Sequence, residues 1–315
     1  MNTRTKARNS MLLVLTSFIW GIAFVAQSTG GEEVGPYSFN CIRFLIGGTV
    51  LLPVIRLLDR MGLSKRKPIT YEERNMLFVG GICCGIALFI ASTLQQLGIY
   101  YGAEVGKAGF LTACYILIVP LLAHFFRRKC GWNIWVGVML ALAGLYLLCI
   151  QGRILLRKPD ILLLLCAVCF SVQILLVDYF SPKVDGVRLS AIQFFTSGVL
   201  GIIPMIIVDM KHSLEGFAQW IPALSTWNAW IPILYAGVLS CGVAYTLQII
   251  GQNGLNPTVA SLIMSLESVF SVLAGWVLLR QKMSGRELAG CGLIFVAIVV
   301  AQIPANHQCS QEENH

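Results

Sequence analysis

Few side chains in this sequence have the types and spacing that covalent catalysis requires. The 315 residues contain no H-E-x-x-H zinc motif, no G-x-S-x-G nucleophile elbow and no G-x-x-x-x-G-K phosphate loop. Cys166 and Cys169 have the spacing of a metal-binding pair, but no second pair accompanies them, so we interpret them as packing residues. We therefore predict that the chain is not an enzyme and that it needs no metal ion or other cofactor.

Glu267 is a candidate for chemistry of another kind, because it is the deepest acidic residue in a long apolar run. It lies ten residues into the run 257–279, which is roughly 15 Å along a helix and near the middle of a ~30 Å hydrocarbon core. A charge at that depth costs on the order of 3 kcal/mol. We expect either a neutral carboxyl bonded to a neighbouring helix, or a group that contacts protons or a substrate amine. Its counterpart in an internal repeat is Cys114.

Arg43 and Asn40 form a second polar pair, about one helical turn apart on the same side of the run 38–58. A cavity-facing Arg43 would favour substrates that carry a carboxylate, which matches the guanidinium fork. Arg43 could equally pair with Glu267, or extend to the lipid headgroups from its shallow position. The sequence leaves these interpretations open.

The remaining candidates are two glutamines and three aromatic residues. Gln95 and Gln248 stand 153 residues apart, near opposite ends of their apolar runs. They suit either matching contacts at two entrances or ordinary helix–helix hydrogen bonds. Trp20, Tyr115 and Tyr245 lie well inside apolar runs, where they could receive an apolar or cationic substrate or simply pack.

The composition indicates what must position these residues. Hydrophobic residues make up 57% of the chain, charged residues only 12%, and the mean hydropathy is +0.75. Soluble domains contain about 25% charged residues, so a soluble enzyme, a disordered chain and a disulfide scaffold are all excluded. The class is an integral membrane protein.

Apolar stretches of spanning length recur ten times along the chain. Since lipid offers no partners for free backbone groups, we predict an all-α membrane protein with ten transmembrane helices. The stretches are at about residues 11–29, 38–58, 75–99, 106–126, 132–150, 161–180, 190–209, 230–250, 257–279 and 286–303.

The loops between these stretches differ in charge. Lys and Arg gather before residue 9, between 60 and 74 and at 127–129, which places both chain ends in the cytoplasm by the positive-inside rule. Basic groups at 153–158 and 280–286 fall on the opposite side and depart from the rule. The net charge of +8 therefore reflects topology, and we expect no nucleic-acid partner.

The chain repeats itself. Residues 40–48 align with 190–198 at an offset of 150, and residues 94–98 align with 247–251 at an offset of 153 that persists through the following spans. The repeating unit has five helices, and an odd number of crossings inverts the second copy. We predict a first repeat over 1–150 with a basic amino-terminal tail, an inverted repeat over 151–303, and a short polar tail over 304–315.

Three stretches stand out in their order and spacing: SFIWGIAFVAQ at 17–27, AGFLTACYILIVPLLA at 108–123 and SLESVFSVLAGWVLL at 265–279. In these stretches the chain resembles the drug/metabolite transporter superfamily, in particular its EamA-type ten-helix members. The resemblance implies transport of small molecules as diverse as amino acids, metabolites and drugs. Ser268 stands where the family often has Pro, which we expect to straighten the ninth helix.

These observations predict a secondary transporter that moves a small metabolite, amino acid or drug-like molecule by alternating access, with export as the expected direction. A multi-helix channel and an intramembrane enzyme are the alternatives. A channel usually builds its pore from rings on several subunits. The expected partners are the lipid bilayer, a small-molecule substrate and, as an open choice, protons, for a monomer or homodimer in the cytoplasmic (inner) membrane.

Overall fold

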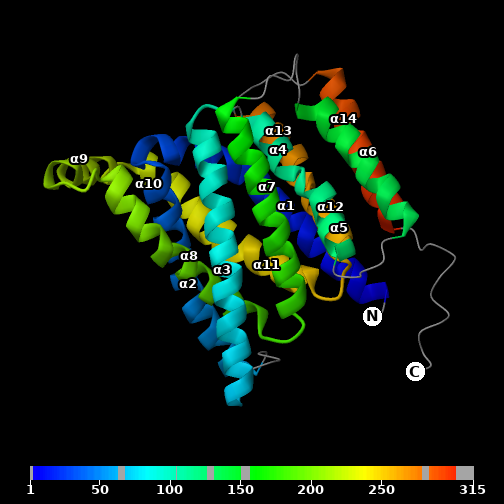
Figure 1. Cartoon of the computed structure of the whole chain (residues 1–315), viewed down its shortest axis with the longest axis horizontal. Helices are drawn as coiled ribbons and strands as arrows, with labels where there is room; N and C mark the ends of the chain where they lie inside the picture. Colours follow the sequence, from blue (N-terminus) through cyan, green and yellow to red (C-terminus); the bar gives the residue numbers. More distant parts are fainter. Residues whose placement is uncertain are drawn as a thin grey trace.

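The computed structural model describes residues 3–62, 68–103, 105–125, 131–149, 157–278 and 284–302. The basic groups at 127–129 and 280–282 and the predicted tail 304–315 lie outside these ranges. Every element within them is helical (Figure 1). The all-helical class is therefore confirmed.

The described residues of the first half form six helices. Proline at the first position starts α2, and a capping box between Thr70 and Glu73 starts α3. The helices are α1 (Thr3–Val34), α2 (Pro36–Arg60), α3 (Tyr71–Tyr100), α4 (Val105–Ala113), α5 (Tyr115–Phe125) and α6 (Trp132–Cys149).

The second half is more divided. Two of its segments are π-helices, in which each turn contains an additional residue. The elements are α7 (Lys158–Phe180), α8 (Gly186–Pro204), η1 (Met205–Asp209), α9 (Leu214–Leu224), α10 (Trp227–Leu234), η2 (Tyr235–Tyr245), α11 (Thr246–Gln252), α12 (Pro257–Met264), α13 (Leu266–Leu278) and α14 (Gly285–Gln302).

Helices fall on all ten predicted apolar stretches. Among the described residues, seven helical segments are long and apolar enough to cross a membrane, and two shorter apolar segments cover Lys107–Ala123 and Trp132–Leu147. The chain is thus a multi-pass membrane protein, and the count of ten crossings stays a prediction. Helix α9 was not predicted and extends sideways from the bundle (Figure 1).

Two of the predicted spans are broken near their centres. Helix α4 ends at Ala113 and α5 begins at Tyr115, while α12 ends at Met264 and α13 begins at Leu266. Helix α13 passes through Ser268 without interruption, but the span as a whole is interrupted three residues earlier. The interruption therefore does not depend on a proline, and the straightening of the ninth helix stays a prediction.

The packing of the halves follows the repeat. Helix α2 packs along α8, and α6 along α14, so equivalent helices meet. Helix α3 packs against α7, and its counterpart α10–η2–α11 packs against α1. We call the side on which α1 begins the terminal face and the side of the α1–α2 turn the distal face (lower and upper in Figure 1).

Helix α2 obtains its amino-terminal cap from the other half. Gly35 occupies the capping position with φ of +89° and has no side chain to offer. Instead, Oδ2 of Asp209, at the end of η1, accepts a hydrogen bond from the backbone N–H of Ser38 at 2.6 Å. A Cβ at Gly35 would lie 2.5 Å from Cγ of Asp209, so only glycine leaves room for this carboxylate.

Candidate functional site

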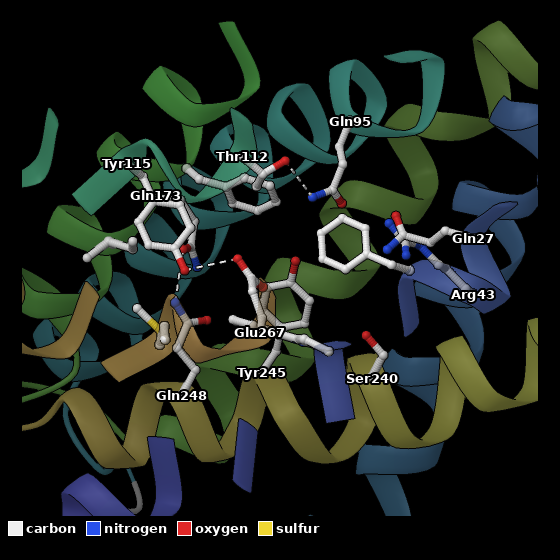
Figure 2. Close-up of a pocket in the computed structure, with 15 residues that line it drawn as sticks. Gln27, Arg43, Gln95, Thr112, Tyr115, Gln173, Ser240, Tyr245, Gln248 and Glu267 are labelled. Atoms are coloured by element: carbon white, nitrogen blue, oxygen red, sulfur yellow. Dashed lines mark hydrogen bonds between the residues drawn. The ribbon is translucent and has the colours of Figure 1, made fainter. Parts of the chain in front are cut away.

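A pocket lies between the two halves, and both halves line it (Figure 2). Its residues come from helices on each side of the repeat. They are Trp20, Phe24, Gln27, Arg43, Gln95, Thr112 and Tyr115 from the first half, and Phe170, Gln173, Ile174, Ser240, Tyr245, Gln248, Met264 and Glu267 from the second.

The breaks in the two interrupted spans bring Tyr115 and Glu267 together. Tyr115 is the first residue of α5, and Glu267 is the second residue of α13. The tyrosine hydroxyl donates to Oε1 of Glu267 at 3.0 Å, and the two residues are only 3% and 5% exposed (Figure 2). This carboxyl can accept further hydrogen bonds, bind an ammonium group, or gain and lose a proton.

Arg43 lies to the other side of the pocket, beside Gln27 (Figure 2). It is 2% exposed, so it does not extend to the lipid headgroups. The guanidinium stacks over the rings of Phe44 and Phe39, with its carbon 4.9 and 5.4 Å from the ring centroids. No ion pair joins it to Glu267 within the described part of the chain. The Arg43–Glu267 pair considered from the sequence is therefore not formed in this structure.

Gln95 and Gln248 both line this single pocket. Nε2 of Gln95 donates to Oγ1 of Thr112 at 3.4 Å, and Nε2 of Gln248 donates to Oε1 of Gln173 at 3.3 Å. Each bond joins two neighbouring helices, as the helix–helix interpretation expects. In this structure both side chains line the same central space, and a role for the pair at two entrances stays a prediction.

Asn40 does not reach the pocket. Its Nδ2 donates to the backbone oxygen of Ser92 at 3.0 Å, which ties α2 to α3. Asn40 and Arg43 are one turn apart, but three residues on a helix differ by about 60° in direction. Asn40 therefore contacts α3, whereas Arg43 faces the cavity.

The aromatic candidates form one wall of the pocket. The rings of Trp20 and Tyr245 lie with centroids 4.6 Å apart, and Tyr245 also meets Phe194 edge to face. Phe170 was missed, although it stands at the repeat offset of 150 from Trp20. Thr112 and Ser240 were also missed, since a small hydroxyl in an apolar helix is usually bonded to its own backbone.

Several polar atoms of the pocket have no partner among the described residues. Three are donors and two are acceptors, and a buried polar atom without a partner costs about 1–3 kcal/mol. The atoms are Nε1 of Trp20, Nε of Arg43, Nε2 of Gln173, Oε1 of Gln27 and Oε1 of Gln248. The pocket is thus chemically incomplete without water or a bound molecule.

The pocket is also narrow. Its cavity volume is about 30 Å³, whereas sites for small organic ligands enclose about 300–1,000 Å³. A second pocket, on the distal face, has a cavity volume of about 300 Å³. Its lining includes Tyr37, Tyr100, Tyr101 and Trp220. In the described residues no three His, Cys, Asp or Glu side chains gather to hold a metal ion.

Comparison with known proteins gives the family. The EamA-like transporter family matches residues 8–150 and, a second time, residues 157–302. The chain belongs to the EamA-like transporter family. It is therefore a membrane transporter, and the two matches coincide with the two halves described above.

Two relatives of this EamA-like transporter are also named as transporters. A protein of Archaeoglobus fulgidus named as an uncharacterized transporter is 25% identical over 297 residues, which cover 92% of this chain and 84% of the relative. Transporter YwfM of Bacillus subtilis, likewise named uncharacterized, is 22% identical, with 97% of both chains covered. A chloroplastic WAT1-related protein of Arabidopsis thaliana is 24% identical over 93% of this chain and 69% of the relative.

A solved crystal structure shares the fold of this EamA-like transporter. The two superpose with a TM-score of 0.72 at 20% sequence identity, over 94% of this chain and 96% of the other. At that identity the likeness speaks for the fold alone.

Proposed function

We propose that this EamA-like transporter is a secondary transporter that binds a small metabolite, amino acid or drug-like molecule in the central pocket. The pocket would open alternately to the two sides of the membrane, with export as the expected direction. One observation carries the proposal: residues of both halves, several of them at equivalent repeat positions, converge on one incomplete polar pocket.

The inverted repeat over 1–150 and 151–303 is supported by matching contacts on opposite faces. A Cβ on Gly98 would lie 3.2 Å from the backbone oxygen of Pro159, and a Cβ on Gly251 would lie 3.0 Å from that of Asn9. The two glycines are 153 residues apart, and Asn9 and Pro159 are 150 apart. Two equivalent close contacts therefore join α3 to α7 and α11 to α1. Under this proposal the terminal face is cytoplasmic, in an inner membrane.

Arg43 supports a substrate with a carboxylate or another anionic group. Its guanidinium is buried, and among the described residues no carboxylate neutralises it. A charged hydrogen bond from a ligand would compensate for that burial. The aromatic rings of Trp20 and Tyr245 would receive an apolar portion of the same molecule.

Glu267 supports a coupling role. A buried carboxyl that changes its proton during each cycle can link substrate movement to a proton gradient. We predict that Glu267→Gln abolishes the dependence of transport on a pH gradient in proteoliposomes, while Glu215→Gln on the exposed helix α9 leaves it intact. An unchanged response to the gradient in Glu267→Gln would remove this residue from the mechanism.

The first experiment should identify the substrate. Metabolites would be compared between cells that lack and cells that overproduce the protein, and the compounds that change would be tested for uptake into proteoliposomes. Counterflow then separates carrier from channel, because only a carrier accelerates labelled uptake when unlabelled substrate fills the vesicle. Uptake without such acceleration would favour the channel alternative.

A further inference from the structure

Two interfaces between the halves are equivalent in the repeat. At the distal interface, the start of α7 packs against the end of α3 and the start of α4. At the terminal interface, the start of α1 packs against the end of α11 and the turn before α12. The paired glycines Gly98 and Gly251 lie at these two interfaces.

The distal interface contains an ion pair. Nζ of Lys107, in α4, lies 2.6 Å from Oδ2 of Asp160, in the first turn of α7. The aspartate side chain is fully buried, and the lysine side chain is 14% exposed. The same oxygen accepts the backbone N–H of Arg157 at 2.8 Å, while Nη2 of Arg157 reaches the backbone oxygen of Gly102 at 3.5 Å.

In the described part of the terminal interface, a hydrogen bond between two neutral groups joins α1 to the turn after α11. Nδ2 of Asn9 donates to the backbone oxygen of Asn253 at 2.8 Å. In the repeat, Ala260 is equivalent to Lys107 and Ser10 is equivalent to Asp160. Alanine and serine cannot form an ion pair. The two interfaces therefore have similar shape and different charge.

A second ion pair between the halves does not distinguish the two faces in this way. The ion pair of 2.6 Å between Arg188 and Asp59 joins α2 to α8, and these helices are each other's equivalents. If the halves exchange conformations during transport, a contact between equivalent helices is preserved. The distal and terminal interfaces instead exchange with each other, so one opens as the other closes.

We propose that the Lys107–Asp160 ion pair is a latch, meaning an interaction that must break before the central pocket can open to the distal face. This inference rests on the alternating-access function proposed above. Because Ala260 and Ser10 occupy the equivalent positions of the terminal interface and carry no charge, the resting carrier favours conformations that open to the terminal face. A hydrogen bond between charged groups is about twice as strong as a neutral one. The distal interface is therefore held closed more strongly than the terminal interface.

Accessibility of a cysteine in the pocket tests the latch without a known substrate. Ser240→Cys would place a thiol in the pocket, and a membrane-impermeant maleimide would be added to right-side-out and inside-out vesicles. The same chain without Ser240→Cys gives the background from native cysteines. The alkylation rate from each side reports how often the pocket opens to that face.

We expect Lys107→Gln to raise the distal rate about tenfold or more and to lower the terminal rate, since the variant loses a hydrogen bond between charged groups. Asp160→Asn should act alike while keeping an oxygen for the helix cap. Lys107→Arg, which retains the pair, should leave both rates unchanged. Asn9→Ala should shift the rates in the opposite direction.

Two results would overturn the latch: unchanged rates in Lys107→Gln and Asp160→Asn, or rates that rise together on both sides, as general loosening would produce. A different result would count against the transport proposal itself. If the thiol reacts from one side only in every variant, including Asn9→Ala, the pocket does not alternate between the faces.

Discussion

Arg43 and Glu267 are the two charged residues that line the pocket, and their surroundings differ. Glu267 has a hydroxyl donor from the opposite half, whereas Arg43 is held by aromatic rings and keeps an unpartnered Nε. The protein itself therefore supplies a hydrogen-bond partner for Glu267. The Nε of Arg43 has no partner within the part of the chain that the structure describes, and it can obtain one from water or a molecule that enters the pocket.

We predict that Arg43→Gln raises the KM for a carboxylate-bearing substrate about ten- to a hundredfold, since one or more charged hydrogen bonds of about 1.5–3 kcal/mol are lost. Initial uptake rates in proteoliposomes measure this. Arg60→Gln, at the exposed end of the same helix, is the matched control. An equal loss for a neutral ester of the substrate would contradict a contact with the carboxylate.

The Tyr115–Glu267 hydrogen bond should stabilise the contact between the broken spans. We expect Tyr115→Phe to lower the free energy of unfolding by about 1–2 kcal/mol, the usual value for a buried bond to a carboxyl. A double-mutant cycle with Glu267→Leu, which removes the acceptor oxygen, isolates the coupling between the two side chains when it is measured by thermal unfolding in detergent. Additive effects would mean that the bond contributes nothing, and Tyr100→Phe on the surface serves as the control.

Sequence reasoning identified those side chains whose chemistry is unusual in lipid. Glu267, Arg43 and Gln248 stand out because a polar group in an apolar run needs a reason to be there. Ser240 and Thr112 gave no such signal, and Asn40 gave one that the contact with α3 explains. Which side of a helix faces a cavity depends on packing, and packing is not written in one sequence.

At the level of elements, the helices were predictable and their irregularities were not. Apolar length indicates where a helix lies, because the bilayer has a fixed thickness. The breaks at Cys114 and Ser265 and the π-helix η2 alter only local hydrogen bonding, so the hydropathy profile does not change. Yet η2 carries Ser240 and Tyr245, and the breaks place Tyr115 beside Glu267.

Gly35 offers a test at this scale. We predict that Gly35→Ala destabilises the protein by about 1–3 kcal/mol, because strain at positive φ is joined by displacement of the Asp209 carboxylate. Gly62→Ala is the control: it has φ of +66° and no neighbour within 4 Å of the added Cβ. Thermal unfolding of the two variants is compared. Similar losses would show that Asp209 contributes no more than backbone strain does.

The whole molecule is organised by its repeat, which the offsets of 150 and 153 residues in the sequence predict. The narrowness of the pocket could not be foreseen, since it depends on how far the halves have closed. The repeat also makes a mechanical distinction. Helices α2 and α8 should stay together through the cycle, while the distal interface should open.

Cross-links test that distinction. A Cβ at residue 201 would lie 3.2 Å from Cβ of Cys41, near the spacing of a disulfide, so oxidised Gly201→Cys should join α2 to α8. We expect transport to persist in that variant. Gly98→Cys combined with Leu163→Cys joins α3 to α7 and should stop transport until a reductant is added. Loss of activity in both would refute a fixed α2–α8 pair.

The cap on α2 has a consequence for biosynthesis. Ser38 and Asp209 are 171 residues apart, so the ribosome completes α2 roughly 10–30 s before the carboxylate that it needs. Until then the first turn of α2 must rely on water or headgroups. A truncated product that ends after the first half would retain this uncapped turn, because Asp209 belongs to the second half.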